Sequence, residues 1–249
     1  MNIIRTKKAY KVICGLVVLI GATLQSSGNV TNPESVQDPK PLEGSGAGGQ
    51  TVRSLHYSFE KHSEGETDIS IPFQGITSID CNIKRFVKLE SLSLGGNKLK
   101  TLPPEIGELR NLRELNLRNN EFEIFPNIIG ELRNLQYLFF DGNEFELLPS
   151  EIGKLENLQE LHLNSNKLKS LPPEIGKLEN LKILDLSCNK LSTLPNTIRE
   201  LPDSLQLLDL RGNSILEVGE KVKTLGRGEL REIFRGRVVF DRDALRRPQ

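Results

Sequence analysis

The sequence predicts an α/β solenoid, in which a parallel sheet lines the concave side and short helices or 3-10 turns line the convex side. Three observations support this fold class. Asparagines recur at a spacing of 23 residues, and finally of 24. Leucines alternate with other residues just before each asparagine, which is typical of a short strand with one buried face. A proline follows most of these asparagines, and apolar residues then recur at a spacing of three, which favours a short helical turn.

The repeat is clearest between Leu158 and Leu181, where its 23 residues read as LxxLxLxxNxLxxLPxxIxxLxx. Seven apolar positions recur in register from copy to copy, which makes the pattern highly specific. The motif resembles the leucine-rich-repeat family over roughly residues 66–240. This resemblance implies a leucine-rich-repeat horseshoe. The asparagine column comprises Asn97, Asn120, Asn143, Asn166, Asn189 and Asn213.

Residues 66–225 are predicted to hold seven repeats. The first repeat is degenerate, because Gln74 stands where later copies have asparagine, but its apolar positions are kept. The repeat frame then breaks, and residues 226–249 are expected to form a C-terminal cap and tail. Within this segment, residues 230–234 indicate a short helix and residues 237–240 a final strand.

The N-terminus has the order of a secretory signal peptide. A basic, polar start is followed by an apolar run from Val12 to Leu24, which is shorter than the ~20 residues needed to span a bilayer. We therefore expect a signal peptide over residues 1–26, cleaved near Ser27. A retained membrane anchor and an intracellular protein stay open as alternatives. Residues 27–65 are rich in Pro, Gly, Ser and charges, and are expected to form a flexible linker.

The recurrent asparagine is predicted to lie where the chain turns sharply after each strand. Backbone groups inside such a turn have no strand partners, and an amide side chain can both donate to them and accept from them. We therefore expect the asparagine column to form a ladder of hydrogen bonds through the solenoid. Glycines of the helical segments are expected to let neighbouring repeats pack closely; these are Gly107, Gly130, Gly153 and Gly176.

The variable positions of each strand are expected to point outward on the concave side. There, Tyr137 and Phe139 place two aromatic side chains in the middle strand, where polar residues would be ordinary. Aromatic side chains at the centre of an exposed surface are typical of interface anchors, although these two could instead be covered by each other or by the tail. The predicted partner-binding residues are Tyr137, Phe139, Glu114, Arg118, His162, Ile183, Asp185, Leu207, Asp209 and Arg211.

Catalysis and metal binding are disfavoured. His162, Asp185 and Ser187 nominally form a Ser-His-Asp set, and Asp209 could add a weak metal ligand. An open sheet face offers neither the oxyanion hole nor the closed cleft that a hydrolase needs. No phosphate-loop, dinucleotide-binding or zinc-protease motif occurs. We expect no catalytic residues, no metal and no cofactor.

The charge balance disfavours nucleic acid as a partner, and the spacing of two cysteines disfavours a disulfide between them. Lys+Arg and Asp+Glu are equal at 33 each, so no net positive charge favours nucleic acid. Cys81 and Cys188 lie five repeats apart, which corresponds to about 24 Å across the sheet. A disulfide between them is therefore not expected, because it needs Cα atoms within about 7 Å.

These patterns predict a non-enzymatic recognition module that binds a protein partner on its concave face as a monomer. The family resemblance implies the recognition role and a bacterial exported protein. The N-terminus implies a protein that is secreted or associated with the cell envelope, with no stable membrane span after cleavage. An intracellular or membrane-tethered scaffold using the same face is the alternative. An effector enzyme is disfavoured, because the repeats leave no segment for a catalytic domain.

Overall fold

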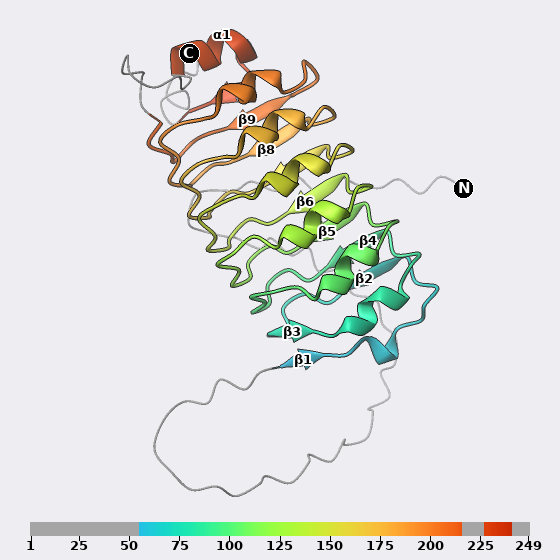
Figure 1. Ribbon diagram of the computed structural model, residues 1–249. Coiled ribbons are helices and arrows are strands. Elements are labelled where there is room, and N and C mark those ends of the chain that lie inside the picture. Colours follow the sequence, from blue (N-terminus) through green and yellow to red (C-terminus); the bar gives the residue numbers. More distant parts are fainter. Residues whose placement is uncertain (1–54, 216–226, 241–249) are drawn as a thin grey trace, which may run out of the picture. The chain divides into compact units, whose positions relative to one another are not determined.

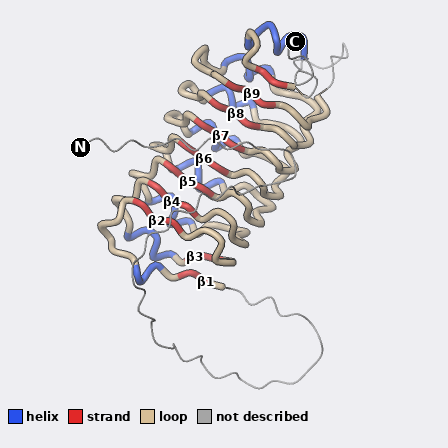
Figure 2. Tube along the Cα trace, turned by 180° about the vertical axis from the view of Figure 1, so that it is seen from behind, coloured by secondary structure: helices blue, strands red, loops and turns tan. Residues whose placement is uncertain are grey.

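The computed structural model describes residues 55–215 and 227–240, and it is built around a parallel eight-stranded sheet. Each repeat contributes one short strand, and the strands lie in chain order from β2 to β10. Figures 1 and 2 show the repeats stacked along one direction, with strands on one side and helical turns on the other. This arrangement confirms the α/β solenoid that the sequence predicts.

The strands and helical segments are short. The strands of the main sheet are β2 (Asp68–Ser70), β4 (Ser91–Ser93), β5 (Glu114–Asn116), β6 (Tyr137–Phe139), β7 (Glu160–His162), β8 (Ile183–Asp185), β9 (Leu207–Asp209) and β10 (Val238–Val239), and a separate parallel pair is formed by β1 (His56–Tyr57) and β3 (Ser78–Ile79). The 3-10 turns are η1 (Phe59–Lys61), η2 (Cys81–Arg85), η3 (Pro104–Glu108), η4 (Asn127–Glu131), η5 (Ser150–Lys154), η6 (Pro173–Lys177) and η7 (Asn196–Glu200), and the α-helix is α1 (Arg227–Phe234).

The central residue of each repeat strand points into the core, and its two neighbours point away from it. Leu115 and Leu138, for example, have no exposed surface, whereas the residues on either side of them are half-buried. The leucine alternation in the sequence therefore becomes the two faces of the sheet. Because Leu115 pairs with Leu138, and equivalent residues pair in the other repeats, successive repeats form straight columns of side chains.

The chain turns after each strand through a residue with a left-handed backbone conformation, directly before the asparagine column. Its φ is 72° at Gly96 and 68° at Gly142, and glycine adopts this conformation without a steric penalty. Other repeats hold the same conformation with a side chain present, at Phe73, Asn119, Ser165 and Cys188. Because no single residue type marks this position, the sequence pattern does not predict it.

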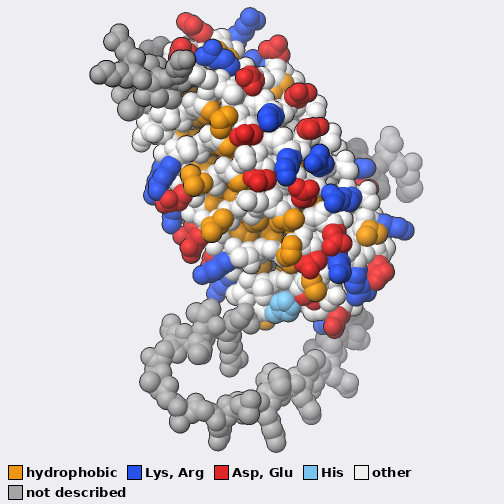
Figure 3. All heavy atoms as spheres, viewed as in Figure 1, with side chains coloured by type: hydrophobic (Ala, Val, Ile, Leu, Met, Phe, Trp, Pro, Cys, Tyr) orange, Lys and Arg blue, Asp and Glu red, His pale blue; other side chains and the backbone are white. Residues whose placement is uncertain are grey.

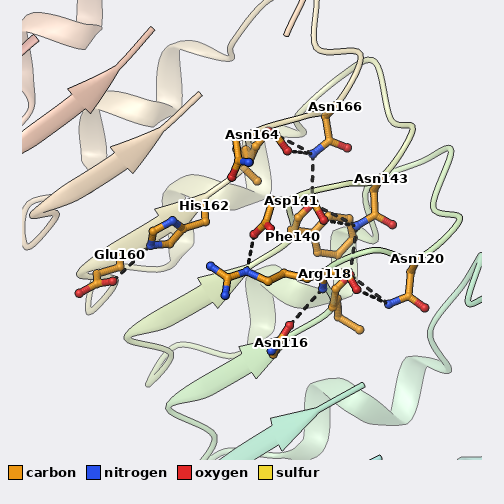
Figure 4. A network of polar contacts seen from close by, with 12 residues as sticks. Asn116, Arg118, Asn120, Phe140, Asp141, Asn143, Glu160, His162, Asn164 and Asn166 are labelled. Carbon is orange, nitrogen blue, oxygen red and sulfur yellow. Dashed lines mark hydrogen bonds and ion pairs between the residues drawn. The ribbon is translucent and has the colours of Figure 1, made fainter. Parts of the chain in front are cut away.

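The recurrent asparagines are buried and form a ladder of hydrogen bonds. The Nδ2 group of Asn143 donates to the carbonyl oxygens of Leu117 at 3.0 Å and Phe140 at 3.1 Å. Its Oδ1 accepts from the backbone N–H of Phe122 at 3.2 Å. Each side chain therefore joins its own repeat to the preceding one, as Figure 4 shows for consecutive asparagines. Within the described residues, the buried Oδ1 of Asn166 has no hydrogen-bond partner.

We expect Asn143→Ala to lower the free energy of unfolding by about 1–3 kcal/mol, because the change leaves buried backbone groups without partners. Urea denaturation followed by circular dichroism measures the difference. Asn127→Ala is the matched control, since Asn127 is exposed and its replacement should change stability by less than about 0.5 kcal/mol. Equal unfolding curves for the Asn143 variant and the parent would contradict a stabilising ladder.

The 3-10 turns begin directly after the recurrent proline. Pro172 caps η6 with a φ of −71°, and its carbonyl oxygen accepts from the N–H of Ile175 at 3.1 Å. The proline thus lies directly before the first residue of the turn. A Cβ at Gly176 would lie only 2.4 Å from the backbone oxygen of Thr197 in the next repeat. Close stacking of turns therefore requires glycine here, and similar clashes would arise at Gly107, Gly130 and Gly153.

Phenylalanines replace leucines in the core of the central repeats. Phe140 has no exposed surface, and its ring centroid lies 5.0 Å from that of Phe122, 4.9 Å from that of Phe125 and 5.2 Å from that of Phe145. These separations are typical of favourable aromatic pairs. The repeats that carry β5 and β6 therefore share one aromatic cluster beneath the sheet.

Residues 55–65, which the sequence places in a flexible linker, instead form an N-terminal cap. The strand β1 pairs with β3, and Phe59 of η1 is fully buried. The centroid of the Phe59 ring lies 5.6 Å from that of Phe86 and 5.1 Å from that of Tyr57. The Tyr57 hydroxyl forms a hydrogen bond with Nε2 of His62 at 2.8 Å. Residues 55–65 have the composition of a linker and lack the leucine pattern, so the sequence does not reveal this folded end.

The opposite end of the stack is covered by α1 and β10. The strand β10 pairs with β9 and extends the sheet. Leu230 and Phe234 of α1 and the following Phe240 are buried, so the cap closes the core at this end. These elements lie where the sequence predicts a short helix and a final strand.

Several predictions concern segments outside the described residues. The predicted signal peptide and the linker up to residue 54 lie there, as do residues 216–226 and the tail from residue 241. Within the described ranges, no helix has the length and apolar character to cross a bilayer. Cys81 is an exposed free thiol, so it forms no bridge to Cys188.

Candidate partner-binding face

The candidate site is the outward side of the main sheet, which we call the concave face and define by the outward-pointing residues of β4 to β9. Because the strands pair in register, equivalent residues of successive repeats lie side by side about 4.8 Å apart. Two columns result. The first holds Ser91, Glu114, Tyr137, Glu160, Ile183 and Leu207, and the second holds Ser93, Asn116, Phe139, His162, Asp185 and Asp209.

Phe139 lies between two partners on the concave face. The guanidinium carbon of Arg118 is 4.2 Å from the centroid of the Phe139 ring. The imidazole centroid of His162 is 5.0 Å from the same ring and tilted by 33°. Since β5 and β7 flank β6, these two side chains approach Phe139 from opposite sides. Phe139 is therefore the middle of a stack of three side chains on the concave face.

Carboxylates hold the Arg118 and His162 side chains at the two ends of this stack, and Figure 4 shows both contacts. The Nε of Arg118 donates to Asp141 at 2.6 Å, and the Nε2 of His162 lies 3.2 Å from Glu160. A guanidinium over an aromatic ring stabilises by about 0.5–1 kcal/mol at an exposed site. The carboxylates restrict the side chains that make this contact, so the surface from β5 to β7 is ordered before any partner arrives.

Tyr137 lies beside this stack without a partner of its own. It is half-buried in the first column, between Glu114 on β5 and Glu160 on β7. In the described part of the chain, the Tyr137 side chain makes no hydrogen bond or ring contact, and Glu114 forms no ion pair. The middle of the concave face thus combines an available aromatic ring with a carboxylate on each side.

The nominal hydrolase set does not assemble. The Ser187 hydroxyl donates to Asp185 at 2.7 Å, whereas His162 interacts with Glu160. The hydroxyl is thus directed at a carboxylate and not at an imidazole that could accept its proton. Burial raises the pKa of Asp185, and hydrogen bonds from Ser187 partly offset this shift. Among the described residues, no cluster of His, Cys, Asp and Glu has an arrangement able to hold a metal ion.

Asp209 and Arg211 form a pair at the C-terminal end of the face. The Nε of Arg211 lies 2.9 Å and 3.0 Å from the two carboxylate oxygens of Asp209. Asp209 is only 4% exposed, because Val239 of the cap lies opposite it on β10. This burial does not favour direct contact of Asp209 with a partner, and its role in partner binding stays a prediction. Asp209 instead orients Arg211, which is exposed.

The predicted binding residues fall into two groups. Ile183 and Leu207 lie opposite each other on β8 and β9, and both are half-buried. They form a small apolar patch beside Asp185 and the Asp209–Arg211 pair. The other five predicted residues lie on or directly after β5, β6 and β7; these are Glu114, Arg118, Tyr137, Phe139 and His162. The ordered stack and the available tyrosine both belong to this second group.

A second exposed surface, which we call the lateral surface, lies in the segments between the asparagine ladder and the 3-10 turns. Ile124 is 79% exposed and Leu147, one repeat further on, is 65% exposed. Figure 3 shows hydrophobic side chains gathered between charged ones on one face of the stack. Sequence reasoning missed this surface, although Thr101 and Ser170 at the same repeat position could have identified it. A groove of about 480 Å³ is lined by Lys100, Thr101, Leu102, Pro104, Glu123, Ile124, Pro126, Asn127 and Ile128.

Comparison with known families agrees with the repeat pattern. A family described as a leucine-rich repeat region matches residues 77–170, and one described as leucine rich repeat matches residues 156–215. The two matches overlap and together cover the strands from β3 to β9. No curated protein sequence matches the chain.

Solved structures with similarity to this chain include one leucine-rich-repeat protein and two receptors. A leucine-rich-repeat protein of Leptospira interrogans is 31% identical over 70% of this chain and 54% of its own, with a TM-score of 0.40. The plant peptide hormone receptor RGFR1, solved in complex with RGF2, is 31% identical over 66% of this chain and 31% of its own, with a TM-score of 0.53. A TDR receptor is 24% identical over 76% of this chain and 35% of its own, with a TM-score of 0.57.

The chain spans about half of the first of these structures and about a third of the two receptors. The recurrent 23-residue motif, the asparagine ladder, the parallel sheet with 3-10 turns and the family matches all agree. The chain belongs to the leucine-rich-repeat family.

Proposed function

We propose that this protein is a non-enzymatic recognition module that binds a partner protein through its concave face. The observation that carries the proposal is the arrangement on β5 to β7. Arg118, Phe139 and His162 form an ordered stack, and Tyr137 beside them is available for contact. Aromatic and arginine side chains supply much of the binding energy in protein interfaces. Side chains that are already ordered lose little conformational freedom on binding.

Similarity to a receptor supports a protein or peptide as the partner. The plant peptide hormone receptor solved in complex with RGF2 is 31% identical over 66% of this chain, with a TM-score of 0.53. The polar groups of the concave face support a non-enzymatic role. The Ser187 hydroxyl donates to Asp185, whereas His162 contacts Glu160, so the three residues do not form a catalytic Ser-His-Asp arrangement. A binding role requires a surface with apolar and hydrogen-bonding groups that complement a partner, and the concave face carries both kinds of group.

We expect the double change Tyr137→Ala and Phe139→Ala to weaken partner binding by about 100-fold or more, because removal of central aromatic anchors commonly costs at least about 2 kcal/mol each. Proteins retained by the immobilised parent from cells and medium are identified first. Their purified forms are then titrated against the parent and the variant by calorimetry. Both side chains are half-buried on the surface, so thermal unfolding should stay cooperative.

The matched control removes two exposed apolar side chains from the lateral surface, with Ile124→Ser and Leu147→Ser. Partners of the concave face should bind this control as tightly as the parent. A partner that binds the concave variant normally but is lost by the lateral variant would contradict the proposal and assign binding to the lateral surface.

Export is part of the same proposal. The expected signal over residues 1–26 places the partner outside the cytosol, whereas an intracellular or membrane-tethered scaffold would find it elsewhere. Sequencing the N-terminus of the protein from fractionated cells separates these cases. A start near Ser27 in the medium or envelope supports export, and an intact Met1 in the cytosol contradicts it.

A further inference from the structure

We propose that the concave face recognises a basic segment of its partner, and that Tyr137, Glu114 and Glu160 form the subsite for a lysine or arginine side chain. The inference rests on the proposed function and adds the chemistry of the partner. It is drawn from the distribution of charge on the face, from the surroundings of Tyr137, and from an ion pair that the chain already contains.

The concave face is acidic, although the whole chain has no net charge. Both of its guanidinium groups are paired within the face, Arg118 with Asp141 and Arg211 with Asp209. At the edge of the sheet, Arg113 is also engaged, 3.2 Å from a glutamate of the preceding repeat. Carboxylates outnumber basic groups on the outward positions of β5, β7 and β8. These are Glu114, Glu160, which also contacts His162, and Asp185, which accepts a hydrogen bond from Ser187.

The surroundings of Tyr137 suit a cation. Glu114 and Glu160 lie directly opposite it on the neighbouring strands, so the chain positions on both sides of the tyrosine carry a carboxylate side chain. An ammonium or guanidinium group within about 6 Å of the ring centroid is attracted by the face of the aromatic ring. At that position its N–H groups come within reach of carboxylate oxygens, which accept charge-assisted hydrogen bonds.

The chain already makes this kind of contact one position further along β6. There, Arg118 lies over the ring of Phe139 while its Nε donates to Asp141. That combination of ring, guanidinium and carboxylate is complete within the chain. Around Tyr137 the ring and the carboxylates are present; Glu160 contacts the His162 imidazole, whereas Glu114 forms no ion pair among the described residues. A basic side chain of the partner would complete the second combination.

Other partner surfaces fit this face less well. An acidic segment would meet like charges along the strands, which disfavours association. A purely apolar segment would desolvate Glu114 without giving it a partner, and burial of an unpaired carboxylate is unfavourable. Charge complementarity therefore selects a basic segment.

Three fluorescein-labelled octapeptides test the inference by fluorescence anisotropy: (Arg-Gly)4, (Ser-Gly)4 and (Glu-Gly)4. The parent should bind the arginine peptide preferentially, and binding should weaken as salt increases. The double change Glu114→Gln and Glu160→Gln should raise the Kd for this peptide about tenfold, and Tyr137→Ala about threefold. Tyr137→Phe should bind like the parent, because the ring face and not the hydroxyl group contacts the cation.

The matched control is Glu105→Gln with Glu108→Gln on η3, which removes the same charge from the opposite side of the stack. This control should bind the arginine peptide like the parent. An equal loss of binding in the control, or tighter binding of the glutamate peptide, would overturn the inference. If the native partner still depends on Tyr137 and Phe139 while no preference for the arginine peptide appears, the basic partner is wrong and the proposed function stands.

Discussion

Replacement of Phe140 by alanine should lower the free energy of unfolding by about 3–5 kcal/mol, the range observed when buried phenylalanines are truncated. Phe140 has no exposed surface and contacts the rings of Phe122, Phe125 and Phe145. The change removes all three ring contacts and leaves a cavity between stacked repeats. In a solenoid each repeat is stabilised by its neighbours, so the loss affects both sides of the cavity.

Phe140→Leu separates the effect of the cavity from that of the aromatic cluster. Leu117 and Leu163 occupy the same position in the adjacent repeats, so leucine is compatible with the backbone. A smaller loss, of about 1.5 kcal/mol or less, is expected for this change. Urea denaturation of both variants provides the measurement. A Phe140→Ala variant as stable as the Phe140→Leu variant would show that the cluster does not hold the central repeats together.

The location of Phe140 ties stability to the candidate site. Phe140 directly follows Phe139, the last residue of β6. The next residue is Asp141, which accepts a hydrogen bond from Arg118. Loosening this repeat should therefore also disturb the ordered stack on the concave face. The residues that we propose for binding and the residues that hold the core alternate along the same few positions of the chain.

The sequence predicts most of the fold because each buried position of the repeat recurs in several copies. A column that contains Leu115 and Leu138 is recognised by its recurrence, even where one copy departs from it. Positions defined by conformation, without a fixed residue type, escape this reasoning. The left-handed residue before each asparagine is glycine at Gly96 but phenylalanine at Phe73, so no pattern of residue types reveals it.

The candidate site is predicted less completely, because side-chain pairing depends on which neighbours meet across repeats. The register places Arg118 and Asp141 at equivalent positions 23 residues apart, and this spacing could have predicted their ion pair. The contact of Arg118 with Phe139 could not be predicted so simply, because it crosses from one column to another. Similarly, the burial of Asp209 depends on the cap strand, which lies outside the repeat pattern.

The N-terminal cap shows a further limit of repeat-based prediction. Residues 55–65 carry no leucine pattern, yet they cover the end of the core through β1 and η1. The first repeat would otherwise expose apolar side chains such as Phe86 at the open end of the stack. A terminal repeat needs such a cover, since no further repeat buries that surface.

We therefore expect Phe59→Ala to lower the free energy of unfolding by about 3–5 kcal/mol, as for other buried phenylalanines. Phe59 has no exposed surface and packs against Phe86 and Tyr57. Phe73→Ala is the matched control, because Phe73 is 70% exposed and its truncation removes little buried apolar surface. Denaturation curves of the two variants measure the difference.

The response should also have a direction along the chain. Because each repeat depends on its neighbours, loss of the cap should first open the repeat beside it and leave the central repeats closed. Hydrogen exchange should therefore accelerate at Ile69 and Ile71 of the first repeat before it does so at Leu138 on β6. Uniform acceleration along the stack would instead mean that the repeats unfold as one cooperative unit and that the cap stabilises all of them equally.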